Sequence, residues 1–222
     1  MEADMKRIFH LFLGVLGMLL AIALAVTVTL NSRWLYIAVM ESEDLENATG
    51  YSRAEILDNY DAVINYNSIF GPNTLKLPSM DMSEGGRIHF VEVKNIFVSI
   101  QAIGILCLMG LFAFAMTASR KKDFSALAVM RNTGILSVVV PALVGLGVAI
   151  NWDRAFVIFH KIFFNNDLWL FDPRTDPIIT ILPDTYFLAC AVMIICLVIL
   201  VSILCLVAYF FLKRKLNNQP TV

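Results

Sequence analysis

Long runs of apolar residues alternate with polar segments along the chain, and this pattern predicts a membrane protein. Four apolar stretches without charged residues are each about as long as the roughly 20 residues that a helix needs to cross the hydrocarbon core of a bilayer. We therefore predict an α-helical integral membrane protein with four transmembrane helices, over residues 8–30, 96–118, 133–150 and 186–212.

Basic residues gather in the short segments on one side of these helices. Nine of the 17 lysines and arginines precede the first span, separate the second from the third or follow the fourth, and such segments are typically cytoplasmic. The two longer segments hold 15 of the 18 acidic residues. Both termini are therefore predicted in the cytoplasm. The basic residues are Lys6, Arg7, Arg120, Lys121, Lys122, Arg131, Lys213, Arg214 and Lys215.

This orientation divides the chain into cytoplasmic, membrane and extracytoplasmic parts. The first span is longer than the 7–15 apolar residues of a signal peptide, so an uncleaved anchor is favoured over a cleaved signal. The predicted parts are 1–30 (cytoplasmic N-terminus and first span), 31–95 (extracytoplasmic), 96–118 (second span), 119–132 (basic cytoplasmic loop), 133–150 (third span), 151–185 (extracytoplasmic), 186–212 (fourth span) and 213–222 (cytoplasmic tail).

The composition agrees with a membrane protein. Apolar residues make up 59% of the chain and charged residues 16%, whereas soluble domains average about 45–50% and about 25%. A soluble enzyme and a disordered regulator are thereby excluded. The net charge of −1 offers no basic surface for nucleic acid.

The predicted spans contain no Asp, Glu, Lys or Arg, although ion and proton pathways usually need such groups. All four cysteines fall inside spans, which argues against thiol redox or zinc–thiolate chemistry. Function is therefore expected at the outer ends of the helices. The cysteines are Cys107, Cys190, Cys196 and Cys205.

The first outer segment begins with an acidic stretch at residues 41–46 that is expected to be flexible. Ser52 and Glu55 then match a capping box, which predicts a helix continuing to about Phe70. Around His89 the alternation suits either a short strand or the start of a helix, about seven residues before the second span. We therefore expect a small mixed α/β extracytoplasmic cap.

The second outer segment is too short to span the membrane and too apolar for a solvated loop. Residues 154–171 are predicted to form an interfacial or re-entrant segment, with His160 on one face with Phe156, Phe163 and Phe164. A single interfacial histidine is usually a hydrogen-bonded anchor. Two histidines on the same side at the same depth, His89 and His160, shift the balance toward acid–base function.

Two groups of residues in these segments match signatures of a known family. The first is Glu84, His89, Val93 and Lys94. The second comprises Phe159, His160, Phe163, Phe164, Asn166, Asp167, Trp169, Asp172, Pro173, Asp176 and Pro183. With these residues, four spans and a large first outer loop, the chain resembles the bacterial lipoprotein intramolecular transacylases over nearly its whole length. The family often has an aspartate at the position of Glu92.

This resemblance implies an acyl shift on membrane lipoproteins in the bacterial plasma membrane. Members move the sn-2 acyl chain of a diacylglyceryl-cysteine onto the α-amino group of the same cysteine, giving the lyso form without a cofactor. The family has two outer histidines that are its catalytic candidates, and they are matched here by His89 and His160.

The proposed chemistry needs a base for the amine and an acid for the departing alcohol, and two histidines can supply both. Nucleophile and electrophile belong to one molecule, so no covalent enzyme intermediate is required. The chain has no Gly-x-Ser-x-Gly elbow. Our hypothesis assigns His160 as the base and His89 as the acid or oxyanion partner, and the converse assignment stays open.

Seven other residues are candidates for binding or orientation. Arg87 or Arg154 could hold a headgroup or oxyanion; Glu84, Asn166 and Asp167 could orient an imidazole; Tyr66 and Trp169 could contact lipid.

Two alternatives come from other functional classes. One is a membrane adaptor or sensor with a partner-binding outer domain, in which both histidines would be dispensable. The other is a zinc site formed by the two histidines with Asp167 or Glu84, although the chain lacks a local metal-binding motif.

Overall fold

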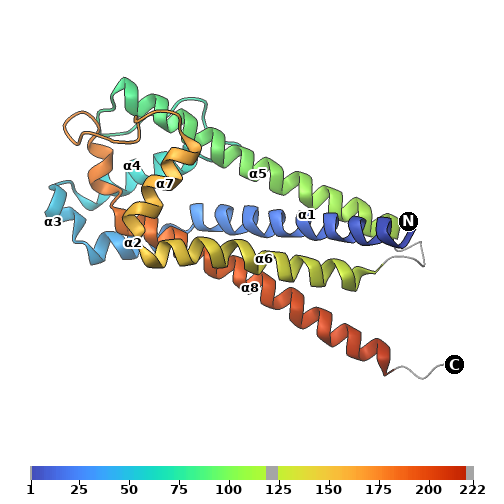
Figure 1. Ribbon diagram of the computed structural model, residues 1–222. Helices are drawn as coiled ribbons and strands as arrows, with labels where there is room; N and C mark the ends of the chain where they lie inside the picture. Colours follow the sequence, from blue (N-terminus) through green and yellow to red (C-terminus); the bar gives the residue numbers. More distant parts are fainter. Residues whose placement is uncertain (1, 119–124, 219–222) are drawn as a thin grey trace. The chain divides into compact units, whose positions relative to one another are not determined.

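The computed structural model describes residues 2–118 and 125–218, and its regular elements are helices (Figure 1). Arg120, Lys121 and Lys122 of the predicted basic loop lie outside these described residues. In chain order the elements are α1 (Glu2–Leu30), α2 (Arg33–Ser42), α3 (Leu45–Thr49), α4 (Arg53–Tyr66), α5 (Glu84–Ala118), α6 (Ala126–Ile150), α7 (Trp152–Phe163), the 3₁₀-helix η1 (Pro177–Ile181) and α8 (Asp184–Asn217).

The four predicted spans are confirmed as helices long and apolar enough to cross a membrane: α1, α5, α6 and α8. All four extend beyond the predicted limits, and α1 starts six residues earlier, at Glu2. α5 starts 12 residues earlier than predicted, at Glu84, and α6 starts at Ala126. α8 includes Lys213 and Arg214, which were expected in a tail. All four cysteines are free and lie in α5 or α8.

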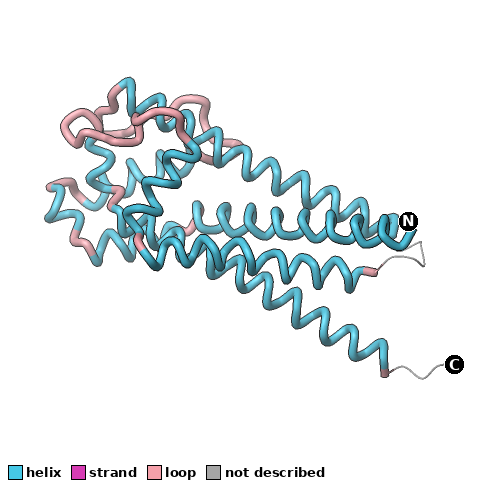
Figure 2. Tube along the Cα trace, viewed as in Figure 1, coloured by secondary structure: helices cyan, strands magenta, loops and turns pink. Residues whose placement is uncertain are grey.

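The mixed α/β cap is wrong, because residues 2–118 and 125–218 contain helices and loops without a strand (Figure 2). The short alternating run around His89 belongs to the first turns of α5. This helix starts early because the Ser83 hydroxyl accepts a hydrogen bond from the Gly86 N–H at 2.9 Å, which caps its N-terminus.

The chain divides into two compact units. The first unit comprises Met1–Val26, Ala102–Leu146 and Met193–Val222. Its helices approach one another through small residues, which allow close backbone contact between membrane helices. Gly17 of α1 faces Thr133 of α6, and the Ser202 hydroxyl of α8 donates to the Gly134 carbonyl of α6 at 2.5 Å.

The second unit comprises Thr27–Gln101 and Gly147–Val192. Tyrosines form the centre of its core. The Tyr36 ring stacks on Tyr60 with centroids 3.7 Å apart, and Tyr186 meets both rings edge-on. The Tyr36 hydroxyl donates to the Ile181 carbonyl at 2.8 Å, which links α2 to η1. Burial raises the pKa of Tyr60 to about 12, so this phenol keeps its proton at neutral pH.

The acidic stretch expected to be flexible is helical. It contributes to α2 and α3, which bury Met40 and Leu45 in the core of the second unit while their acidic side chains stay exposed. Arg53 at the start of α4 pairs with Glu41 at 2.8 Å and also contacts Glu46. These short helices therefore have an exposed charged face and a buried apolar face.

The predicted capping box of α4 is confirmed. The Ser52 hydroxyl accepts from the Glu55 N–H, and the Ser52 N–H donates to the Glu55 carboxylate at 2.9 Å. The helix ends at Tyr66, four residues before the predicted limit. The Gln101 side chain of α5 donates to the Asn67 carbonyl and accepts from the Ile69 N–H, so it satisfies the backbone where α4 ends.

Candidate active site

His89 lies in the second turn of α5, and contacts at the start of this helix fix its position. Asp176 is buried and accepts a hydrogen bond from the Ser83 N–H at 2.8 Å. Gly86 allows this approach, because a Cβ there would lie 2.2 Å from the Asp176 carboxylate. The loop before η1 therefore anchors the turn that carries His89.

The His89 side chain is only 6% exposed and lies among aromatic rings. Its ring centroid is 4.7 Å from that of Phe164 and 5.3 Å from that of Phe171. The Nδ1 atom is buried and has no hydrogen-bond partner among the described residues. A buried nitrogen without a partner is unusual in a protein core, so it is available to a ligand.

His160 comes from α7, whose first turn is capped by the Asn151 side chain accepting from the Arg154 N–H. The imidazole is 9% exposed and stacks against Trp169 with centroids 4.5 Å apart and an interplanar angle of 28°. The Phe156 ring packs at 4.2 Å, as its predicted place on the same face implies, whereas Phe163 is exposed and contacts Phe159.

A hydrogen bond defines the protonation pattern of His160. Its Nδ1 lies 2.8 Å from the Phe156 carbonyl oxygen. A carbonyl can only accept, so Nδ1 carries the proton and the lone pair of the neutral ring is on Nε2. The geometry therefore makes Nε2 the basic nitrogen.

Burial keeps this ring neutral. It lowers the pKa of His160 below the ordinary 6.5, although the Phe156 carbonyl and the Asp184 carboxylate act in the opposite direction. At neutral pH the ring therefore has the unprotonated nitrogen that a general base needs.

The two imidazoles lie side by side in the second unit. Their ring centroids are 6.3 Å apart and their planes differ by 28°. The rings belong to elements about 70 residues apart in the sequence, and Phe164 packs against both of them. Two buried imidazoles at this distance could act on the same small functional group from two sides.

The contacts of four other candidate residues are with groups other than the two rings. Glu84 and Arg87 form an exposed ion pair with each other, one turn before His89. Arg154 is exposed on α7. Tyr66 is buried at the end of α4, where the Lys94 ammonium lies 4.5 Å from its ring centroid.

The remaining three come from the loop after α7. Trp169 stacks on His160, and its indole Nε1 is buried without a hydrogen-bond partner among the described residues. Asn166 donates to the Glu92 carboxylate at 2.8 Å, whereas Asp167 is exposed. Sequence reasoning set Glu92 aside, although it follows His89 by three residues, a spacing that places both on one helix face.

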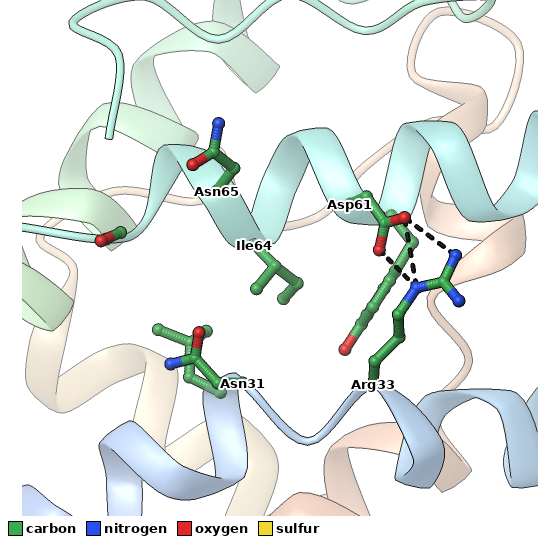
Figure 3. Close-up of a pocket in the computed structure, with 8 residues that line it drawn as sticks. Asn31, Arg33, Asp61, Ile64 and Asn65 are labelled. Atoms are coloured by element: carbon green, nitrogen blue, oxygen red, sulfur yellow. Dashed lines mark hydrogen bonds and ion pairs between the residues drawn. The ribbon is translucent and has the colours of Figure 1, made fainter. Parts of the chain in front are cut away.

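A cavity of about 280 Å³ lies elsewhere in the second unit. Figure 3 shows the Asn31 and Asn65 amides beside it and the paired Arg33 and Asp61 side chains at one end. Neither histidine lines it. In the part of the chain that the structure describes, no three His, Cys, Asp or Glu residues are grouped to hold a metal ion, so the suggested zinc site is not formed.

Four membrane-length helices define an integral membrane protein, and its second unit holds a buried pair of imidazoles. Comparison with known proteins identifies the family. The sequence profile described as lipoprotein intramolecular transacylase Lit matches residues 11–187. The chain therefore belongs to the lipoprotein intramolecular transacylase family. No curated protein sequence matches it significantly.

Solved structures agree with this assignment. An in meso structure of the membrane integral lipoprotein intramolecular transacylase Lit from Bacillus cereus is 33% identical, with a TM-score of 0.88 over 98% of this chain and all of that chain. Two further structures of the same protein, also 33% identical, carry arginine or alanine in place of one histidine. They match at TM-scores of 0.83 and 0.84, over 98% of this chain and 96% and 98% of theirs.

Membership of this family makes the chain an acyltransferase and confirms the resemblance seen in the sequence. The adaptor interpretation is not favoured, because similarity to an enzyme extends over almost the whole chain.

Proposed function

We propose that His160 and His89 together catalyse the transfer of the sn-2 acyl chain of a diacylglyceryl-cysteine to the α-amino group of the same cysteine. The observation that carries this proposal is the pair of buried imidazoles 6.3 Å apart, one of them with a basic Nε2. The substrates are lipoproteins in a bacterial plasma membrane. Both termini of the chain are cytoplasmic, and the reaction occurs at the outer leaflet.

The first chemical requirement is a neutral amine, because an ammonium has no lone pair. The α-amino group has an ordinary pKa of about 7.7–8.0, so it is mostly protonated at neutral pH. His160 Nε2 accepts a proton from this nitrogen, and the amine then attacks the carbonyl carbon of the sn-2 ester. An N–C bond forms and the ester oxygen becomes an oxyanion.

The second requirement is a proton for the leaving group. When the bond between the carbonyl carbon and the glycerol oxygen breaks, that oxygen must leave as an alcohol. The nitrogen begins as an ammonium and loses two protons on becoming an amide. One is transferred to the departing oxygen and the other is released to solvent when His160 is regenerated, so the reaction is balanced without a co-reactant. His89 donates to the oxyanion or to the departing oxygen. We assign the base to His160, because its Nδ1 already donates to a carbonyl.

Positioning supplies much of the remaining rate enhancement. Holding amine and ester in reactive geometry contributes about 7–11 kcal/mol in ideal intramolecular systems. We infer that the exposed apolar side chains of α7 contact lipid beside the site and that Arg154, exposed on the same helix, binds a headgroup. The exposed apolar residues are Ile158, Phe159, Ile162 and Phe163.

The direct test replaces each histidine by alanine and follows lyso-lipoprotein formation by mass spectrometry of the N-terminal lipopeptide. General acid–base groups contribute about 10²–10⁴-fold, so His160→Ala and His89→Ala should each lose at least about 100-fold in rate. His10→Ala, in the first unit, serves as the matched control and should retain activity. Full activity of either outer variant would contradict the assignment of both rings to the reaction.

A further inference from the structure

The Glu92 carboxylate is held in place from one side. Asn166 donates to its Oε1 atom at 2.8 Å. The same Asn166 side chain accepts from the Leu168 N–H at 3.0 Å, so its oxygen is engaged with the backbone and its amide N–H₂ is directed at the carboxylate. A residue that anchors the loop after α7 thus orients a side chain of α5.

The second carboxylate oxygen has no such contact. Glu92 Oε2 is buried and has no hydrogen-bond partner among the described residues. Burying an acceptor of this kind without a donor is costly, and native structures rarely contain one without a reason. Glu92 Oε2 therefore lacks the hydrogen-bond donor that a buried carboxylate oxygen needs.

The two neighbouring basic side chains of α5 are engaged elsewhere. Arg87 pairs with Glu84, and the Lys94 ammonium donates to the Pro72 carbonyl at 2.5 Å. Neither of them neutralises Glu92.

The elements that position Glu92 also carry groups of the imidazole pair. Its helix carries His89 three residues earlier, so the two side chains share a face of α5. The loop that holds it through Asn166 also presents Trp169, which stacks on His160. The carboxylate is therefore positioned by the same helix and loop as the two rings.

We propose that Glu92 Oε2 binds the α-ammonium group of the lipid-bearing cysteine before His160 removes its proton. This inference rests on the proposed function. An ammonium supplies the missing donor and a compensating charge, and charge-assisted hydrogen bonds are about twice as strong as neutral ones. Asn166 acts as a positioning residue, because it orients the carboxylate without touching the substrate.

This assignment also gives the site a basis for selectivity. Acyl transfer converts the charged amine into a neutral amide, so the product loses its ionic contact with Glu92. The carboxylate therefore favours binding of lipoproteins with a free amino terminus over those already N-acylated. The N-acylated product binds less tightly than the substrate.

The experiment measures binding of unreactive lipopeptides to the full chain in detergent at pH 7. The probes are diacylglyceryl-cysteine peptides whose sn-2 chain is ether-linked, with a free amine, an N-acetyl group or a hydrogen in place of the amine. The unsubstituted protein should bind the free amine about tenfold more tightly than either neutral probe, since a charge-assisted contact accounts for such a ratio.

Glu92→Gln should reduce this preference to less than about threefold while leaving the affinity for the neutral probes unchanged. Asn166→Ala should reduce it partly, because the carboxylate is present but less well oriented. Glu43→Gln, an exposed glutamate in the second unit, is the matched control and should keep the full preference.

An undiminished preference in Glu92→Gln would overturn the proposal. So would equal losses for charged and neutral probes in the Glu92 and Asn166 variants, because a structural role would weaken all three probes alike. The ether-linked probes cannot react, so this result is independent of turnover. Failure of the histidine assignment is instead detected by the acyl shift on an ester substrate.

Discussion

The two units of the chain bury different kinds of side chain. The buried residues of the first unit are mostly small, such as Ala23 and Ser137, and they let helices pack closely. The second unit buries large aromatic and polar side chains joined by hydrogen bonds, including Tyr36, His89 and Asp176. Close packing of small residues is enough to associate helices, whereas fixing the direction of an imidazole requires hydrogen bonds and flat surfaces. The candidate chemistry lies in the second unit.

The largest effect is expected when alanine substitutions at two glycines of α5 are compared. In Gly86→Ala the new Cβ would lie 2.2 Å from the Asp176 carboxylate, so the buried Asp176 side chain, its hydrogen bond to Ser83 or the start of α5 must shift. We expect a loss of about 2 kcal/mol in the free energy of unfolding, typical of overpacking, and a clear loss of acyl transfer because His89 is one turn away.

Gly110→Ala, in the part of α5 that belongs to the first unit, is the control. Its Cβ would make an ordinary contact at 3.8 Å with Leu16. Unfolding in detergent and acyl-shift assays on both variants give the comparison. Equal stability and activity of the two would show that the start of α5 is not held as the structure indicates.

The pH dependence of kcat/KM follows from His160. In the proposed mechanism the neutral ring is the base, so the rate should fall as the pH decreases through its pKa and the ring becomes protonated. Because burial lowers this pKa below 6.5, the acid limb should be centred below pH 6.5, with a fall of about tenfold for each further pH unit. An acid limb centred above pH 6.5 would argue against a buried neutral base.

Removing one buried hydroxyl group from each unit compares how much a side-chain hydrogen bond stabilises each of them. Tyr36→Phe removes a buried hydrogen bond to the Ile181 carbonyl and leaves that acceptor unpaired, at a cost of about 1–2 kcal/mol. Ser202→Ala removes an interhelical bond to Gly134, and such bonds average about 0.6 kcal/mol within membranes. Thermal unfolding in one detergent should rank the two variants in this order, and the opposite ranking would contradict it.

The smallest effect is expected beside the cavity of the second unit. Arg33 and Asp61 form an ion pair at 2.8 Å, but both side chains are nearly half exposed. Asp61→Asn should therefore cost only about 0.2–0.5 kcal/mol, and less at high salt. A loss as large as that of Tyr36→Phe would show that this pair has a greater role than its exposure implies.

The sequence was sufficient to predict the four spans, because apolar runs of that length have few other interpretations. It was ambiguous around His89, where a short alternating run suits a strand or the start of a helix and two glycines disfavour a helix. The capping interactions that start α5 there include a contact with Asp176, about 90 residues away, which no local pattern reveals. α2 was missed for a similar reason, since Tyr36 finds its partners in α4, η1 and α8.

For the candidate site, the sequence indicated two histidines at similar depth and the family resemblance gave them a role. It could not predict which ring nitrogen is basic, because that depends on the Phe156 carbonyl one turn earlier in α7. Nor could it connect Glu92 with Asn166, which are 74 residues apart. The three-residue spacing from His89 was the one local signal for Glu92.

The bond between His160 and the Phe156 carbonyl also restricts how the imidazole can move. A ring tied at Nδ1 and stacked on Trp169 cannot rotate to exchange its two nitrogens. Any proton that it takes up at Nε2 must leave from the same atom. In the proposed mechanism, the amine and the departing glycerol oxygen would therefore have to reach this atom in turn, unless His89 protonates the departing oxygen.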